Sequence, residues 1–145
     1  MDLQLNDKLA VVSGSTAGIG FAIAEALAKE GARVVVNGRT QSAVTEAVAK
    51  IGQGAVGFAG DLSDAAKAAE LVKKFPNVDI LVNNLGIFEP KPFEEIPDED
   101  WRRFFDVNVL SGVRLARAYL PGMRRRDWGR IIFISSESGI QIPVG

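Results

Sequence analysis

Three glycines near the start of the chain have the spacing of a phosphate-binding turn. Gly14, Gly18 and Gly20 follow an apolar run, Leu9–Ser13, and precede a segment with helical periodicity. Gly14 allows a sharp turn off the strand, Gly18 lets backbone N–H groups approach a ligand, and Gly20 lets the helix pack close to the strand. The helix N-terminus then presents free N–H groups and a partial positive charge to an anion. The turn therefore predicts binding of a dinucleotide pyrophosphate.

Other residues of the same turn add donors to this expected site. Ser13, Ser15 and Thr16 carry hydroxyl groups, and Ile19 lies between the last two glycines. We expect Ser15, Thr16 and Ile19 to contact the cofactor together with the glycines. The alternative is a tight turn that binds no ligand, because three glycines within a short stretch also arise by chance.

The end of the second expected strand indicates which dinucleotide is bound. The segment from Arg33 to Thr40 contains no carboxylate, and its polar residues near the strand end are Asn37 and Arg39. A carboxylate here would accept the adenine-ribose hydroxyls and repel a 2′-phosphate. Arg39 can instead bind a phosphate through two parallel hydrogen bonds. We therefore predict that NADP(H) is favoured over NAD(H). The alternative is that Arg39 is a solvated loop cation.

Four further polar landmarks follow the later elements. Asp61-Leu62 follows the third expected strand, Asn83-Asn84-Leu85-Gly86 ends the fourth, and Ser136 ends the fifth. Asn108 lies inside a long apolar helix, where Asn is disfavoured. We expect a distortion of the helix or a chain of water molecules to offset the cost of placing Asn108 there. The alternative is that the Asn108 side chain is exposed to solvent. For Asp61 the alternative to a ligand is a turn or capping residue, and Asn83 and Asn84 can also satisfy backbone groups between strands.

Together these motifs resemble those of the short-chain dehydrogenase/reductase family, over essentially all 145 residues. The resemblance implies hydride transfer between a nicotinamide cofactor and a carbonyl or alcohol substrate. It implies that Asn108 and Ser136 are catalytic, with Ser138 a weaker candidate than Ser136. It also implies a set of cofactor-binding residues, namely Gly14, Ser15, Thr16, Gly18, Ile19, Gly20, Asn37, Arg39, Asp61, Leu62, Asn83, Asn84 and Gly86.

The chain departs from the family pattern in three places. Leu85 stands where the family has a small Ala, and Ala17 stands where many NADP-preferring members carry a basic residue. The family's Tyr-x-x-x-Lys is missing, since the one tyrosine is Tyr119 and no lysine follows Lys91. Because an ordinary tyrosine has a pKa of about 10, it needs a nearby cation to act near neutral pH. We therefore expect the 145-residue chain to be the nearly inactive N-terminal part of a longer enzyme. The alternative is a non-catalytic dinucleotide-binding module.

Strand and helix signals alternate along the chain, which favours parallel strands joined by helices. Apolar runs predict strands at Leu9–Ser13, Arg33–Asn37, Ala55–Ala59, Asp79–Asn83 and Arg130–Ser135. In the first helix the periodicity predicts a buried stripe at Ile19, Ile23, Ala26 and Leu27. In the second and third helices it predicts Val44, Val48 and Ile51, and then Ala68, Leu71, Val72 and Phe75. The long helix after Asp98 carries Trp101, Phe104, Phe105, Val109, Val113, Ala116 and Leu120.

These elements predict one α/β domain over residues 1–145, a Rossmann-like, doubly wound parallel sheet of order 3-2-1-4-5 that stops after the fifth strand. The ligand crevice is expected at the carboxyl ends of the strands. The resemblance implies two more strands and a helix after the fifth strand, so the run Ile131–Ile134 is expected to form an unpaired apolar edge that is prone to association. It also implies a homo-oligomer, a dimer or tetramer, for the full-length parent.

Composition excludes several classes of function. The formal net charge of −1 provides no field to attract nucleic acid or an anionic membrane, so we expect neither as a partner. Zero His and zero Cys exclude a thiolate nucleophile, a Ser-His pair and a zinc site with the usual ligands, so no metal is expected. The lack of cysteine and of a signal peptide favours the cytoplasm. The substrate stays a small molecule of unspecified identity.

Overall fold

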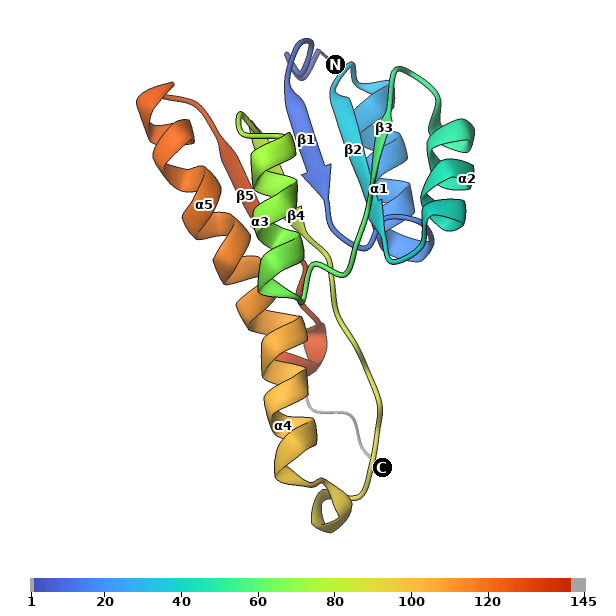
Figure 1. The fold of residues 1–145 in the computed structure, drawn as a ribbon, viewed down its shortest axis with the longest axis vertical. Coiled ribbons are helices and arrows are strands. Elements are labelled where there is room, and N and C mark those ends of the chain that lie inside the picture. Colours follow the sequence, from blue (N-terminus) through green and yellow to red (C-terminus); the bar gives the residue numbers. More distant parts are fainter. Residues whose placement is uncertain (1, 142–145) are drawn as a thin grey trace.

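The predicted parallel sheet is present in the structure. The structure, a computed structural model, describes residues 2–141, so both ends of the predicted domain lie outside the described residues. Its five parallel strands have the predicted order β3-β2-β1-β4-β5 (Figure 1). They are β1 (Leu9–Val12), β2 (Arg33–Gly38), β3 (Val56–Ala59), β4 (Ile80–Asn83) and β5 (Arg130–Phe133). Each boundary lies within two residues of the predicted one.

Helices cover both faces of the sheet, as a doubly wound fold requires. The helices α1 (Gly18–Lys29) and α2 (Gln41–Ile51) pack on one face, and α3 (Ala65–Lys74) and α5 (Ser111–Arg125) pack on the other. Successive strand residues point to opposite faces. Val12 of β1 therefore joins the core under α1 and α2, whereas Val11 joins the core under α3 and α5. This explains why the strands are continuously apolar.

The inner face of α1 differs from the prediction. Its buried residues are Gly20, Ala24 and Ala28, whereas Ile19 is 66% exposed. A Cβ on Gly20 would overlap the Gly14 carbonyl and the Asn84 amide. The helix lies so close to the sheet that only small residues fit between them, and the larger Ile23 and Leu27 pack at the side of the contact. Periodicity identified the helix but placed its buried stripe on the larger residues.

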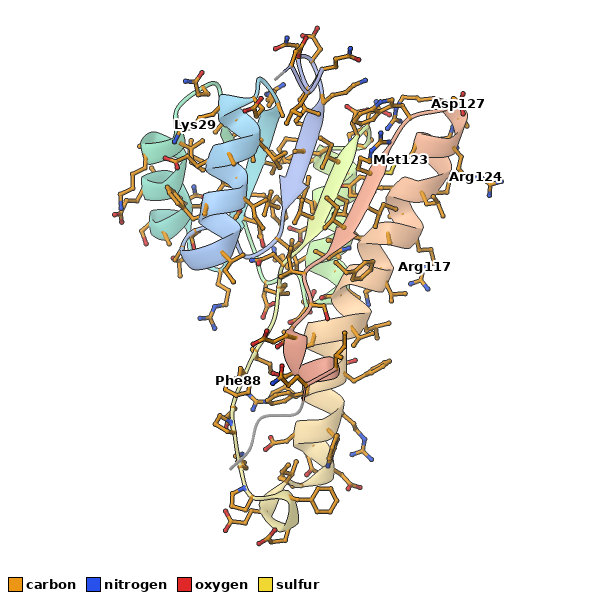
Figure 2. All side chains as sticks on the ribbon, turned by 180° about the vertical axis from the view of Figure 1, so that it is seen from behind. Lys29, Phe88, Arg117, Met123, Arg124 and Asp127 are labelled. Carbon is orange, nitrogen blue, oxygen red and sulfur yellow. The ribbon has the colours of Figure 1, made fainter. Side chains whose placement is uncertain are left out.

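The long helix contains the distortion that Asn108 predicted. The helix α4 (Asp98–Phe105) leads into η2 (Asp106–Leu110), a turn of π-helix centred on Asn108, and then into α5. Most of the large apolar residues expected along this helix are exposed, among them Trp101, Phe105, Val109, Val113 and Leu120. The buried side of α5 consists of Ser111, Gly112, Leu115, Tyr119, Gly122 and Met123. Figure 2 shows Arg117 and Arg124 pointing outwards from α5.

The fifth strand forms an edge of the sheet with one hydrogen-bonded neighbour among the described residues, β4. Ile132, Phe133 and Ile134 are each between 40% and 50% exposed. The backbone N–H of Ile134 still donates to the Asn83 carbonyl at 2.9 Å, so pairing continues one residue past the strand. An apolar edge of this kind can pair with another strand.

Candidate dinucleotide-binding site

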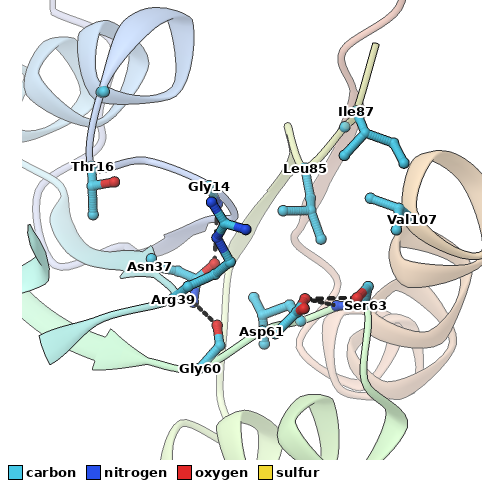
Figure 3. Close-up of a pocket in the computed structure, with 14 residues that line it drawn as sticks. Gly14, Thr16, Asn37, Arg39, Gly60, Asp61, Ser63, Leu85, Ile87 and Val107 are labelled. Atoms are coloured by element: carbon cyan, nitrogen blue, oxygen red, sulfur yellow. Dashed lines mark hydrogen bonds between the residues drawn. The ribbon is translucent and has the colours of Figure 1, made fainter. Parts of the chain in front are cut away.

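A cavity lies at the carboxyl ends of the first four strands. Its volume is about 300 Å³, and it opens between the ends of β1, β2, β3 and β4 (Figure 3). Seven of the predicted cofactor residues line it, namely Gly14, Thr16, Asn37, Arg39, Asp61, Leu62 and Gly86. In open parallel sheets ligands bind at this position, because the helix N-termini and the connecting loops converge there.

The glycine turn has the geometry of a phosphate cradle. Gly14 and Gly18 have φ angles of +59° and +58°, which side chains with a Cβ rarely adopt. A Cβ on Gly18 would meet no atom within 4 Å, so the space in front of the turn is open to a ligand. No side chain caps α1, since its N-cap residue is Ala17. The backbone N–H groups of the first turn are therefore free to bind an anion.

The hydroxyl groups of Ser13 and Ser15, predicted as phosphate donors, have hydrogen-bond partners within the protein. The Ser15 hydroxyl donates to the Val12 carbonyl at 2.6 Å, and its backbone N–H donates to the Asn37 carbonyl at 2.7 Å. Ser13 Oγ accepts hydrogen bonds from the backbone N–H groups of Asn84 and Leu85, both at 3.0 Å. Both side chains are buried, so they tie strand ends together beneath the turn.

Asn37 and Arg39 have different surroundings at the end of β2. The Asn37 amide is buried, accepts from the Gly14 N–H at 3.0 Å and donates to the carbonyls of Phe58 and Gly60. It thus fixes the glycine turn to the ends of β2 and β3. Arg39 is exposed at the cavity, where it is the one cation among the described lining residues.

Asp61 serves the turn that follows β3. Its Oδ1 accepts from the Ser63 N–H at 2.9 Å and from the Ser63 hydroxyl at 2.7 Å. The Ser63 carbonyl in turn accepts from Arg114 at 2.8 Å, which ties this loop to α5. The Asp61 side chain also lines the cavity, so the turn role and the predicted ligand role are compatible.

The two asparagines after β4 differ in their hydrogen bonds. Asn84 Nδ2 donates to the carbonyls of Ser13 and Gly14 at 3.1 and 3.0 Å, so it braces the glycine turn. The buried amide of Asn83 has no hydrogen-bond partner among the described residues and packs against Gly112 of α5. A Cβ on Gly112 would overlap the Phe133 ring and would lie 3.0 Å from Asn83 Cγ, so a glycine suits this close packing.

Asn108 lies next to Gly86 and Ile87, which follow β4 and line the cavity. Its Oδ1 accepts from the Ile87 N–H at 2.6 Å and its Nδ2 donates to the Ile87 carbonyl at 3.1 Å. A Cβ on Gly86 would lie 3.2 Å from Asn108 Oδ1, so the asparagine reaches the rim of the cavity. A π-helical turn is rare and is often found at functional sites.

Ser136 stands beyond the end of β5. Its hydroxyl accepts from the Ser138 N–H at 3.1 Å and caps the short turn η3 (Glu137–Gly139). The side chain is exposed. The capping role explains the serine locally, and it leaves the hydroxyl accessible to a ligand.

Tyr119 is separate from this site, as the sequence predicted. Its side chain is 2% exposed in the core between the sheet, α3 and α5, and its hydroxyl has no hydrogen-bond partner in the described part of the chain. Burial raises the pKa of the Tyr119 hydroxyl above its ordinary value. A tyrosine held neutral in an apolar core cannot exchange protons with a substrate.

Sequence reasoning missed several residues that line the cavity. Ile87 and Val107 are aliphatic residues without a distinctive spacing, and no sequence signal separated them from core positions. Gly38 directly follows the predicted β2, and a Cβ there would overlap the Thr16 side chain. A glycine immediately after a strand was a signal that could have identified Gly38, and likewise Gly60 after β3.

The family is identified by comparison of the whole chain. The family model for short chain dehydrogenases matches residues 8–144. The chain belongs to the short chain dehydrogenase family. Its glycine turn, parallel sheet and cavity are therefore those of a dehydrogenase/reductase fold.

Curated relatives of this short chain dehydrogenase include oxidoreductases from several bacteria. It is 50% identical over 145 residues to an uncharacterized oxidoreductase, YvaG, of Bacillus subtilis (strain 168). That alignment covers 97% of this chain and 55% of the relative. It is 43% identical over 144 residues to a D-beta-hydroxybutyrate dehydrogenase of Cupriavidus necator. This second alignment covers 94% of this chain and 56% of that enzyme. The chain thus spans a little over half the length of these relatives.

Solved structures of dehydrogenases and reductases superimpose closely. A short chain dehydrogenase/reductase family protein has a TM-score of 0.94 at 36% identity, and the match covers 100% of this chain and 61% of that one. L-Sorbose reductase from Gluconobacter frateurii, complexed with NADPH and L-sorbose, has a TM-score of 0.89 at 36% identity, covering 97% and 57%. Among residues 2–141, no helix has the length and apolar character needed to cross a membrane.

Proposed function

We propose that this chain is the cofactor-binding part of an NADP(H)-dependent oxidoreductase that acts on a small carbonyl or alcohol substrate. The observation that carries the proposal is the shared cavity, in which the open glycine turn and Arg39 lie around the same space. The turn suits a pyrophosphate, and the guanidinium suits a second phosphate nearby. When bound, the nicotinamide supplies or accepts the hydride.

The cofactor preference rests on charge at the end of β2. Asn37 is neutral and its amide is already bonded to the backbone, so it neither repels a 2′-phosphate nor competes for it. Arg39 can reach across the opening of the cavity and pair with a dianionic group. An NAD-specific site would carry a carboxylate here.

Asn108 and Ser136 are proposed to act at the substrate end of the site. Ser136 presents an exposed hydroxyl that can hold the substrate oxygen. Asn108 fixes the Ile87 backbone at the cavity rim through two hydrogen bonds, so it can hold a water or a backbone group in line with the substrate. The proton itself requires a general acid/base, which the family provides through Tyr-x-x-x-Lys.

The deciding experiment measures the cofactor affinity of the full-length protein encoded by the reading frame that contains this chain. Arg39→Ala is expected to weaken NADPH binding at least tenfold, since a charge-assisted hydrogen bond contributes about 1.5–3 kcal/mol, and to leave NADH binding unchanged. Isothermal titration calorimetry with both cofactors measures the two affinities.

A neighbouring cation provides the control for this experiment. Arg33 begins β2, is exposed and does not line the cavity, so Arg33→Ala should preserve both affinities. Equal losses for NADPH and NADH in Arg39→Ala would mean that Arg39 supports the structure of the loop, and the preference for NADP(H) would then be wrong.

The remaining parts of the proposal concern the whole protein. We propose that it works in the cytoplasm as a homo-oligomer, a dimer or tetramer. Family membership and the exposed apolar residues along α4 and α5 support the homo-oligomer. Sedimentation of the full-length protein would measure its mass in solution.

A further inference from the structure

The extended segment between β4 and α4 runs alongside the long helix (Figure 1). In the described part of the chain, no hydrogen bond joins the backbone of residues 86–91 to another backbone group. Ile87 of this segment lines the cofactor cavity, and Asn108 holds its N–H and its carbonyl. Side chains therefore set the position of the segment at the cavity.

Four charged side chains bind the same segment to α4. Glu89 accepts from Arg103 at 2.5 Å, and Lys91 donates to Asp100 at 2.6 Å. Lys91 Nζ also lies 3.3 Å from Glu89 Oε1, and Arg103 Nη2 lies 3.6 Å from Asp100 Oδ1. The four residues thus form one cluster of ion pairs, the loop clamp. Arg103 and then Lys91 lower the pKa of the Glu89 carboxyl below its ordinary value, so this carboxylate is ionised at neutral pH.

The clamp and Asn108 hold the segment along one line of the helix. Ile87, Glu89 and Lys91 are alternate residues, and they are bound in turn by Asn108, Arg103 and Asp100. Phe88, which stands between two of them, is 89% exposed. Asn108 follows Asp100 by about 2.2 turns of regular α-helix, which would place the two on different faces. The π-helical turn η2 holds more residues per turn, so it brings Asn108 back towards the face of the clamp.

We propose that the loop clamp positions Ile87 at the nicotinamide end of the cofactor cavity. This inference rests on the proposed function. Figure 3 shows Ile87 and Val107 together at one side of the cavity and Arg39 at the other. Since Arg39 is assigned to the 2′-phosphate of the adenosine half, the side with Ile87 is left for the nicotinamide half. Exposed ion pairs contribute little to stability, so the clamp adjusts this position rather than holding the fold together.

The test compares NADPH with 2′,5′-ADP, which contains the adenosine half alone. Full-length wild type and Arg103→Gln are titrated with both ligands in a calorimeter, and hydrogen exchange of the Ile87 amide is followed by NMR. Arg103→Gln is expected to weaken NADPH binding about two- to fivefold, the range of an exposed ion pair, and to leave 2′,5′-ADP binding unchanged. Exchange of the Ile87 N–H should accelerate by a similar factor, because the segment opens more often.

Companion variants separate positioning from general stability. Arg103→Lys keeps the charge and should restore most of the NADPH affinity. Glu89→Gln should repeat the loss, and the double variant Glu89→Gln/Arg103→Gln should lose no more than either single variant, because both act through one pair. Arg102 provides a matched control, since it lies on the same helix and pairs with Asp98 at 3.8 Å. Arg102→Gln should change neither affinity nor the exchange of Ile87.

Three results would overturn the inference. They are unchanged NADPH affinity in Arg103→Gln, an equal loss for NADPH and 2′,5′-ADP, and additive losses in the double variant. If wild type bound neither ligand, the proposed function itself would fail. That outcome differs from a wild type that binds both ligands beside an Arg103→Gln variant that binds them equally well, which rejects the role of the clamp alone.

Discussion

Gly18 is the residue at which backbone conformation and ligand access coincide. Its φ of +58° is unfavourable for any side chain with a Cβ, and the space in front of it is open. Gly18→Val should therefore abolish binding of NADPH, because the added methyl groups block the approach of a phosphate to the first turn of α1. Calorimetry on the full-length variant measures the loss.

Gly52 provides a control for the strain that this substitution introduces. It ends α2 with a φ of +62°, and a Cβ there also meets no atom within 4 Å. Gly52→Val should lose a similar amount of stability, about 1–2 kcal/mol or more for a β-branched residue, and keep its cofactor affinity. If the two variants bound NADPH equally well, the glycine turn would not be the phosphate site.

At the scale of the elements, Tyr119 links α5 to the sheet core without using its hydroxyl. The group is buried and has no partner in the described part of the chain, so Tyr119→Phe should be neutral or stabilising near pH 7. Burial raises the folded-state pKa of Tyr119 above the unfolded value of about 10. The contribution of the neutral Tyr119 to the free energy of unfolding is therefore complete below pH 10. Above pH 10 the unfolded chain loses this proton while the folded chain keeps it, so the free energy of unfolding falls as the pH rises.

The pH dependence of Tyr119→Phe tests this account. Relative to the wild type, the variant should gain about 1.4 kcal/mol between pH 8 and pH 11, because only the wild type has a tyrosine that ionises on unfolding. Urea unfolding at both values of pH measures the difference. A loss of more than 1 kcal/mol at pH 7 would show that the buried hydroxyl has a partner, for example an ordered water.

At the scale of the whole molecule, the 145 residues contain the proposed cofactor site without the general acid/base that the family uses. Asn108 and Ser136 are present, and the Tyr-x-x-x-Lys of the family is absent from the 145 residues. A polypeptide limited to these residues should show no steady turnover of NADPH or NADH, because the loss of a general acid/base typically removes a factor of about 10²–10⁴. A spectrophotometric assay with the full-length protein as reference checks this. Robust turnover by a species of verified mass would contradict the assignment of the catalytic groups.

The sequence by itself determined the order of the elements, the parallel sheet and the location of the glycine turn. Alternating apolar runs and helical stripes are local patterns, and the rules for parallel connections leave few ways to arrange them. The distortion expected at Asn108 is present as the π-helical turn, and the Asn108 side chain is also exposed, as the alternative interpretation had it.

Only the tertiary structure decided which polar groups remain available to a ligand. Ser15 and Asn37 looked like cofactor ligands, yet their side-chain atoms bond to strands far away in the sequence. Ile87 and Val107 carried no sequence signal that separated them from core positions, and they line the cavity. Hydrogen bonds and close packing between segments that are distant in the sequence give some polar side chains partners within the protein and leave others facing the cavity. A local pattern of residues does not contain this information.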